Sequence, residues 1–276
     1  MPVSADIVGK ELPTQTFEYT QRDVMLYALG VGAGLDELDF IYEKNLKVLP
    51  TFAVIPAFPV MGGLGSVITF NPALLLHGEQ GIRLNGPIPT SGKLTTTGKI
   101  AAVWDKGSGA VVVIESETRD ESGKTLFSNT ASVFLRGEGG FGGERGPSGP
   151  KNVPPDRAPD ATVSYTTLPI QAALYRLSGD RNPLHIDPDF AKLGGFDRPI
   201  LHGLCTFGHV GRAILHTYAG SDPARFKSME ARFSGVVYPG ETITTEMWQE
   251  PGGKIYFQAK TERGENVITG GLAEVA

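Results

Sequence analysis

The chain has 276 residues, a hydrophobic fraction of 40% and a net charge of −5, which allow one large domain or two ordinary ones and argue against nucleic acid as a partner. Its single cysteine, Cys205, excludes an intramolecular disulfide and suits a reducing compartment. No apolar run reaches the roughly 18 residues that a membrane-spanning helix needs, so we predict no membrane segment.

In the first half, Tyr27 is followed by a glycine-rich segment, residues 30–34. This segment lacks the G-x-G-x-x-G spacing and no strand–helix–strand pattern surrounds it, so we predict no NAD site and no other cofactor. Residues 50–61 are expected to form a helix that Pro56 and Pro59 shorten or kink. Three runs rich in β-branched residues then predict a meander of strands, at 94–104, 110–118 and 125–136.

Residues 137–160 are so rich in glycine and proline that they cannot bury a core, and they predict a partly extended linker. Beyond the linker the pattern of the first half returns. Apolar positions at helical spacing predict a helix over 204–218. Three strands are expected at 243–249, 254–261 and 267–275. The chain therefore contains two copies of one fold, in residues 1–136 and 161–276.

The two copies differ most after their matching tyrosines. The second copy continues from Tyr175 as YRLSGDRNPLH, which places Asp180, Asn182 and His185 within six residues. Pro183 disfavours a helix at the residue before it, so we expect a loop whose polar side chains converge. A carboxylate and an imidazole aimed at one point can deprotonate a water and deliver a proton elsewhere. The alternative is a polar turn stabilised by an Asx-type cap.

The remaining histidines of the second half do not suggest a metal site. His202, His209 and His216 follow one another at steps of seven, which separates them by about 10 Å along a helix. Three nitrogens that far apart cannot bind one zinc ion. We predict no metal, and we interpret these histidines as structural or surface residues, with His202 orienting the turn before the helix.

The motif Y-x-L-S-G-D-x-N-P-L-H at 175–185, together with RPILHGLCTF at 198–207, resembles the hydratase 2 family, also called MaoC-like enoyl-CoA hydratases. The resemblance covers most of the chain outside the first residues and the linker. It implies an α+β double hotdog, in which two antiparallel sheets each wrap a central helix. It also implies reversible hydration of trans-2-enoyl-CoA to (3R)-3-hydroxyacyl-CoA, with a non-catalytic, acyl-binding first half.

The resemblance assigns roles to individual residues. Asp180 and His185 flank the attacking water, and Asn182 holds the water or orients a partner, while the residues alone do not decide which of the pair is the base. The N–H of Gly203, at a helix N-terminus, suits the negative charge that develops on the thioester oxygen. The acyl-CoA path is expected to be lined by seven further residues: His77, Gly78, Lys106, Arg181, Pro183, Leu184 and Phe233.

Other functions of the same fold remain open. A (3R)-3-hydroxyacyl-ACP dehydratase would run the same chemistry on another carrier. A hotdog thioesterase would need water to attack the carbonyl carbon, and a non-catalytic acyl-CoA-binding protein would not need the polar loop. The first residues lack a basic region followed by an apolar stretch, so we expect no secretory signal and a cytoplasmic location. The resemblance also implies a homodimer, with acyl-CoA as the substrate.

Overall fold

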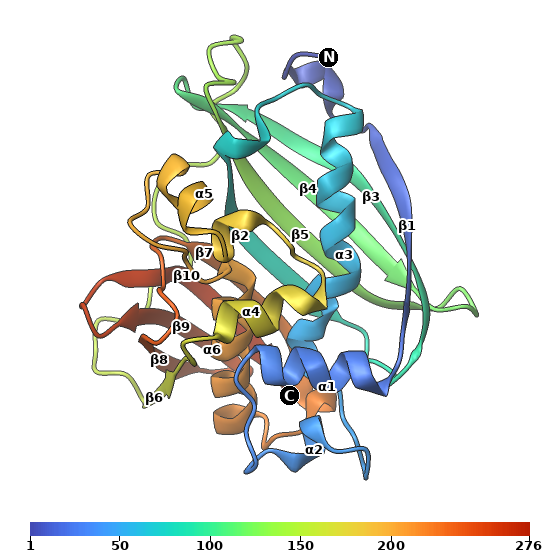
Figure 1. Cartoon of the computed structure of the whole chain (residues 1–276), viewed down its shortest axis with the longest axis vertical. Coiled ribbons are helices and arrows are strands. Elements are labelled where there is room, and N and C mark those ends of the chain that lie inside the picture. Colours follow the sequence, from blue (N-terminus) through green and yellow to red (C-terminus); the bar gives the residue numbers. More distant parts are fainter.

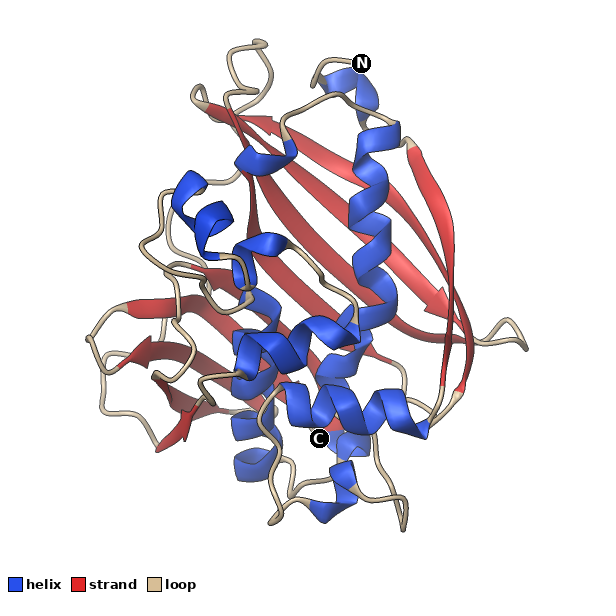
Figure 2. Ribbon diagram, in the orientation of Figure 1, coloured by secondary structure: helices blue, strands red, loops and turns tan.

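A computed structural model describes the 276 residues, except for the side chain of residue 73. Its main feature is one ten-stranded sheet in which every neighbouring pair of strands is antiparallel (Figure 2). The first half contributes β1 (Glu11–Tyr19), β2 (Leu75–Leu84), β3 (Gly92–Asp105), β4 (Gly109–Arg119) and β5 (Thr125–Arg136). The second half contributes β6 (Ala161–Thr166), β7 (Phe226–Phe233), β8 (Thr242–Glu250), β9 (Lys254–Thr261) and β10 (Asn266–Val275).

The strand order demonstrates the duplication. It runs β1-β3-β4-β5-β2-β7-β10-β9-β8-β6, so each half repeats the order of the other in reverse from the centre. The halves join where β2 pairs with β7, in a register that sets Glu79 opposite Arg232 and Ile82 opposite Met229. An ion pair of 2.8 Å between Arg232 and Glu79 reinforces this joint. The predicted double hotdog is confirmed, and its two sheets are continuous.

Each half-sheet curves around a central helix, α3 (Val54–Gly62) in the first half and α6 (Gly203–Tyr218) in the second (Figure 1). Four further helices lie outside the two central ones: α1 (Gln21–Gly30), α2 (Leu38–Ile41), α4 (Gln171–Tyr175) and α5 (Pro188–Leu193). Single 3-10 turns complete the chain at Ala5–Ile7, Pro50–Ala53, Gly63–Ser66, Pro72–Leu74, Arg176–Ser178, Pro183–His185 and Pro223–Arg225.

The prolines of the first half shorten its central helix, as predicted. Residues Pro50–Ala53 form a 3-10 turn before α3, which has nine residues against the 16 of α6. Pro59 lies inside α3 at an exposed position, so its ring stays outside the core, but it cannot donate the i→i−4 hydrogen bond of a regular helix. On the opposite side Val60 packs so close to Gly98 of β3 that a Cβ there would lie 2.4 Å from it.

The six predicted strands are all present, with bounds that differ by two residues or fewer. Four strands were not predicted: β1, β2, β6 and β7. Two glycines interrupt β2, and Pro13 accompanies a register shift in β1 between Leu12 and Gln15. Their pairing partners are far away in the sequence, and local propensity does not register such contacts.

The linker, 137–160, contains no helix or strand and is anchored along the sheet. The Asp105 carboxylate accepts hydrogen bonds of 2.8 and 2.9 Å from the backbone N–H groups of Gly140 and Gly142. Both glycines have positive φ, 83° and 78°, a backbone conformation that side chains disfavour. Further along, Asn152 donates hydrogen bonds to Glu230 and to the Gly270 carbonyl. The linker is therefore an ordered spacer.

Candidate active site

The polar loop of the second half is built by local hydrogen bonds. After the 3-10 turn at 176–178, Gly179 adopts φ 140° and reverses the chain. The Asp180 carboxylate accepts a bond of 3.1 Å from the N–H of Asn182, whose own side-chain oxygen accepts one of 3.0 Å from the N–H of Leu184. Asn182 thus caps the turn Pro183–His185, so the Asx-type cap that was the alternative interpretation is present in this loop.

His185 is buried and held in one tautomer. Its Nδ1 lies 2.9 Å from the Ile200 carbonyl, which can only accept, so Nδ1 carries the proton. In the neutral ring Nε2 then has a lone pair available for a proton. Burial lowers the pKa of His185 below its ordinary value, although the charge of Asp180 and the bond to Ile200 oppose that shift. The neutral, basic form is therefore favoured near neutral pH.

A third residue, His202, completes the cluster. Ligand atoms of Asp180, His185 and His202 all lie within 4.8 Å of one another. The rings of His185 and His202 stack, with centroids 3.7 Å apart and planes inclined by 28°. The Nε2 of His202 donates a 3.1 Å hydrogen bond to the Asp180 carbonyl. Burial, reinforced by His185 and Arg176, holds the pKa of His202 well below its ordinary value.

These three residues have the types that could bind a metal ion, but the stacking does not fit one. Imidazole nitrogens bind zinc at about 2.0–2.1 Å. Ring nitrogens donate in the plane of the ring, and the planes of His185 and His202 lie face to face. An ion shared by both would lie out of the plane of at least one ring. The geometry suits acid–base chemistry better.

Gly203, the first residue of α6, lies directly after His202. Its N–H has no acceptor within the helix because the first turn of any helix leaves such groups unpaired. The ring of Phe233 packs over this residue, and a Cβ on Gly203 would lie 3.2 Å from it. Glycine thus allows an aromatic wall to close on a free N–H, which is the group expected to stabilise an oxyanion.

Two of the predicted substrate residues lie beside this wall. The ring of His77 meets that of Phe233 edge to face, with centroids 5.0 Å apart. His77 precedes Gly78, where the pairing of β2 with β5 shifts register. Burial lowers the pKa of His77 to about 4, so this imidazole is neutral, and its Nε2 donates to the Glu79 carbonyl.

A pocket extends from this point into the first half, between α3 and the sheet. Its cavity volume is about 20 Å³, which holds a water molecule or two. Leu204 lies at the second-half end, and Phe58 and Met61 of α3 form a half-buried wall. The other lining residues are Val54, Ala57, His77, Gln80, Ile114, Ser116, Asn129 and Ala131.

Of the polar residues in this lining, His77 was predicted to contact substrate, whereas Gln80, Ser116 and Asn129 were not. Gln80 donates 2.9 Å to the side chain of Asn129, which donates 3.2 Å to the Ala53 carbonyl at the start of α3. Asn129 lies in a predicted strand and Gln80 in the unpredicted strand β2, and neither position gave a signal of a pocket. Their contacts depend on a helix whose sequence position is far from theirs.

The remaining predicted substrate residues lie outside the pocket. Lys106, in the β3–β4 turn, donates its amine to the carbonyls of Arg145 and Pro147 in the linker, the second at 2.9 Å. Arg181 and Pro183 are exposed on the polar loop, and half-buried Leu184 lies against the Gly194 corner. Their contact with acyl-CoA stays a prediction.

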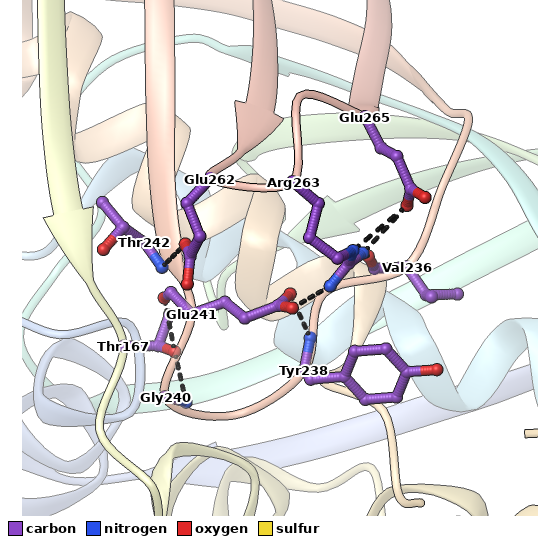
Figure 3. A network of polar contacts seen from close by, with 9 residues as sticks. All are labelled: Thr167, Val236, Tyr238, Gly240, Glu241, Thr242, Glu262, Arg263 and Glu265. Atoms are coloured by element: carbon purple, nitrogen blue, oxygen red, sulfur yellow. Dashed lines mark hydrogen bonds and ion pairs between the residues drawn. The ribbon is translucent and has the colours of Figure 1, made fainter. Parts of the chain in front are cut away.

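A polar network around Glu241 and Arg263 holds the loop that precedes β8 (Figure 3). Glu241 pairs with Arg263 and accepts a 2.8 Å bond from the N–H of Tyr238, and Arg263 also donates 2.9 Å to the Val236 carbonyl. The next carbonyl, that of Val237, accepts a 2.7 Å bond from the N–H of Leu201. The network therefore positions the residue that precedes His202.

Comparison with known proteins covers both halves. Residues 17–137 match the family model of the MFE-2 hydratase 2 N-terminal domain, and residues 151–271 match that of the MaoC-like domain. A probable enoyl-CoA hydratase 2 of Dictyostelium discoideum is 45% identical over 97% of this chain and 94% of its own length. A 3-hydroxyacyl-thioester dehydratase Y of Mycobacterium tuberculosis is 46% identical over 94% and 92%.

Solved structures and longer relatives agree with these matches. The crystal structure of a MaoC-like dehydratase from Phytophthora capsici superposes with a TM-score of 0.91 at 37% identity, over 99% of this chain and 98% of that one. A peroxisomal hydratase-dehydrogenase-epimerase of Neurospora crassa is 49% identical over 97% of this chain, which spans only 31% of that protein. Among the helices that the structure describes, none has the length and apolar character needed to cross a bilayer.

Proposed function

Since the chain belongs to the hydratase 2 family of MaoC-like proteins, we propose that it hydrates trans-2-enoyl-CoA reversibly to (3R)-3-hydroxyacyl-CoA, as a hydro-lyase of fatty-acid or related acyl-CoA metabolism. The observation that supports this best is the position of Asp180 and His185. They lie within 4.8 Å of His202, whose neighbour Gly203 offers a free helix N-terminal N–H. Acid–base groups and an oxyanion donor are the parts that hydration of a conjugated thioester needs.

The proposed reaction assigns each group one task. A water bound between Asp180 and His185 adds its oxygen to C3, and Nε2 of His185 accepts one of its protons. The C2=C3 π electrons move toward the thioester, whose oxygen becomes an enolate stabilised by the Gly203 N–H. The imidazolium, beside the carboxylate of Asp180, then delivers the proton to C2. Water is thereby added across the double bond, and the groups return to their starting states.

The first half is proposed to hold the acyl tail. The pocket between α3 and the sheet begins at Leu204, next to Gly203, and is lined mainly by apolar side chains. Its small cavity requires the wall to move, and a flexible residue such as Met61 suits that movement. Binding energy from a tail held there would help position C3 against the water.

The same residues would serve the reverse reaction. One relative carries the name 3-hydroxyacyl-thioester dehydratase, so dehydration of a 3-hydroxyacyl thioester is the second candidate. The chemistry is the same run backward, and the carrier, CoA or ACP, is what differs. No cofactor is proposed, because CoA enters as part of the substrate.

Location and assembly are also proposals. We propose a homodimer, as the family resemblance implies. Several relatives bear peroxisomal names, such as the enoyl-CoA hydratase 2 of Arabidopsis thaliana, so a peroxisomal location competes with the cytoplasmic one. Light scattering would decide the first point, and imaging of the tagged protein in its own cells would decide the second.

The decisive experiment is hydration of a series of enoyl-CoA thioesters from crotonyl to palmitoyl. Loss of the conjugated thioester absorbance measures hydration, and chiral analysis of the product identifies the 3R alcohol. Parallel assays with ACP thioesters separate the two carriers. Release of free thiol without hydration would instead identify a thioesterase, and an inert but folded protein that binds acyl-CoA would identify a binding protein.

A further inference from the structure

His202 connects three parts of the site through its side chain and its backbone. Its Nε2–H donates to the Asp180 carbonyl at 3.1 Å, its ring stacks on His185 at 3.7 Å, and its backbone carbonyl accepts the N–H of Cys205 at 3.0 Å as α6 begins. It therefore contacts the loop that carries the carboxylate, the imidazole itself and the helix end that presents the Gly203 N–H.

His202 is itself fixed from the other side. The ring of Tyr175 lies 4.9 Å from it between centroids, so Tyr175, His202 and His185 form a column of three rings. Both His202 and Tyr175 are only 1% exposed. The column thus leaves His202 in one position and covers one face of the His185 ring.

The hydrogen bonding of His202 keeps it uncharged. Because Nε2 donates to a carbonyl, Nδ1 bears the lone pair of the neutral ring, and this buried atom has no hydrogen-bond partner among the described residues. A proton on Nδ1 would find no acceptor and would add a charge against His185 in a buried place. A neutral ring is therefore the stable form.

We propose that His202 is a positioning residue, which holds His185 in its neutral, basic form and aligns Asp180 with the Gly203 N–H without touching the substrate. This inference rests on the proposed function for its catalytic consequence. A charged His202 would repel the imidazolium that forms on His185 during the reaction, whereas a neutral aromatic face excludes water and supports the ring.

The titratable groups around the pair come from several elements. Burial lowers the pKa of His185 and of His202, and Asp180 opposes this for His185. The charge of Arg176 acts in the same direction as burial on His202. The charges that act on the pair come from Asp180 of the loop and Arg176 of the preceding turn. Tyr175 of α4 packs on His202, and Tyr27 of α1 and Cys205 of α6 act on Tyr175 in turn.

Two variants separate the donor from the ring. His202→Gln keeps an N–H donor but removes the stacked face, so water reaches His185 and its pKa rises. We expect kcat to fall by about 10²-fold, the effect of a displaced catalytic group, with KM little changed and the acidic limb of the pH profile moved to higher pH. His202→Phe keeps an aromatic ring against His185 but loses the N–H that donates to Asp180. We therefore expect kcat to fall less than in His202→Gln, with the acidic limb of the pH profile unchanged.

His209→Gln is the matched control, because His209 is a buried histidine of α6, the helix that begins after His202, and it bonds to the Cys205 carbonyl. It should leave the acidic limb in place. NMR titration of His185 in all four proteins measures its pKa without any assay of activity. A wild-type protein that hydrates no enoyl-CoA would overturn the proposed function alone. An unchanged kcat and an unchanged His185 pKa in folded His202→Gln would overturn this inference.

Discussion

In the second half His185 lies ten residues after Tyr175, and in the first half Glu37 lies ten residues after Tyr27. The two tyrosines occupy matching places in the two hotdogs, and their rings lie 6.2 Å apart between centroids. The side chains ten residues after these tyrosines, however, differ in their hydrogen-bond and ion-pair partners. Nε2 of His185 has no protein partner among the described residues, whereas the carboxylate of Glu37 is paired and 9% exposed.

The partners of Glu37 come from the other half. Its carboxylate forms an ion pair with Arg212 and contacts His216, both on α6. Arg212 also donates 2.8 Å to the Val31 carbonyl. In the first half, the position ten residues after the tyrosine therefore forms an ion pair that links this half to α6, the central helix of the second half. The comparison shows how one fold gives a reactive or a structural site, according to whether the buried polar group at this position has a partner within the protein.

The largest expected effect on activity comes from removing Asp180 or His185, the groups that Glu37 lacks the freedom to replace in the first half. Asp180→Ala or His185→Ala should lower kcat by about 10²- to 10⁴-fold, the range for general acid–base groups. Steady-state hydration of crotonyl-CoA measures the loss. Glu37→Gln, assayed below its unfolding temperature, is the control and should keep kcat within the same order of magnitude.

The double variant Asp180→Ala/His185→Ala sharpens the assignment. Because the two groups act on one water, the double should be little worse than the worse single variant. Activity near the wild-type level in either single variant, with normal circular dichroism, would show that the pair is not the acid–base machinery.

The next effect is on stability. Arg212→Met removes the cation and leaves the buried carboxylate of Glu37 without its main partner, which costs about 3–5 kcal/mol in typical proteins. Urea unfolding should show this loss, and the double variant with Glu37→Gln should recover part of it. Additive losses in the double variant would mean that the two residues do not act as a pair.

The same pair predicts a pH dependence. Burial would raise the pKa of Glu37, but hydrogen bonds and charge from His216 and Arg212 outweigh it and lower the pKa from 4.5 to about 2. A carboxylate whose pKa is lowered by folding contributes stability above its unfolded pKa and loses it as pH falls through the folded one. The difference in unfolding free energy between wild type and Glu37→Gln should therefore shrink as pH falls from 4.5 toward 2. A constant difference across that window would contradict this linkage.

The polar loop of the second half was predictable because its signal is local. Pro183, Gly179 and the spacing of Asp180 and His185 all act within a few residues, and the structure keeps them on one loop. From the glycines at 30–34 the sequence predicted only that no NAD site is present. Gly32 is explained by the fold, since a Cβ there would lie 2.6 Å from Nε2 of His209 on α6. Such a contact joins distant segments, and the sequence of either one does not contain it.

The pocket between α3 and the sheet was predictable only in outline. Pro56 and Pro59 indicated a short helix and hence space in the first half, but not the polar pair Gln80 and Asn129. Those side chains meet across β2 and β5, whose pairing depends on a strand that the sequence did not reveal. Long-range pairing was the missing information in both cases.

A smaller effect tests the division of labour between the halves. Ala57→Trp places a large ring in the pocket of α3, where Ala57 is 9% exposed. We expect kcat/KM for long or bulky enoyl-CoA to fall by about tenfold or more, within the range by which a pocket contact discriminates substrates, while crotonyl-CoA is spared. Met61→Ala should widen the same pocket and act in the opposite direction. Equal damage to short and long substrates in a folded Ala57→Trp protein would exclude the first half as the tail site.

Titration with a tight, unreactive acyl-CoA tests the same division by counting sites. With the Glu37 position closed by its ion pair, one equivalent per chain is expected. Two equivalents would mean that the first half has kept a site of its own.

The smallest expected effect concerns Lys106, for which a contact with CoA was predicted. Its amine already donates to the carbonyls of Arg145 and Pro147, so its replacement mainly loosens the linker. Lys106→Met should lower the unfolding free energy by about 1 kcal/mol or less, as for a partly exposed hydrogen bond, and leave KM for crotonyl-CoA unchanged. Lys124→Met, in the exposed β4–β5 turn, is the matched control and should change neither quantity. A rise in KM that disappears with pantetheine thioesters would instead place the Lys106 amine on a CoA phosphate, and the linker contact would then belong to the unliganded protein.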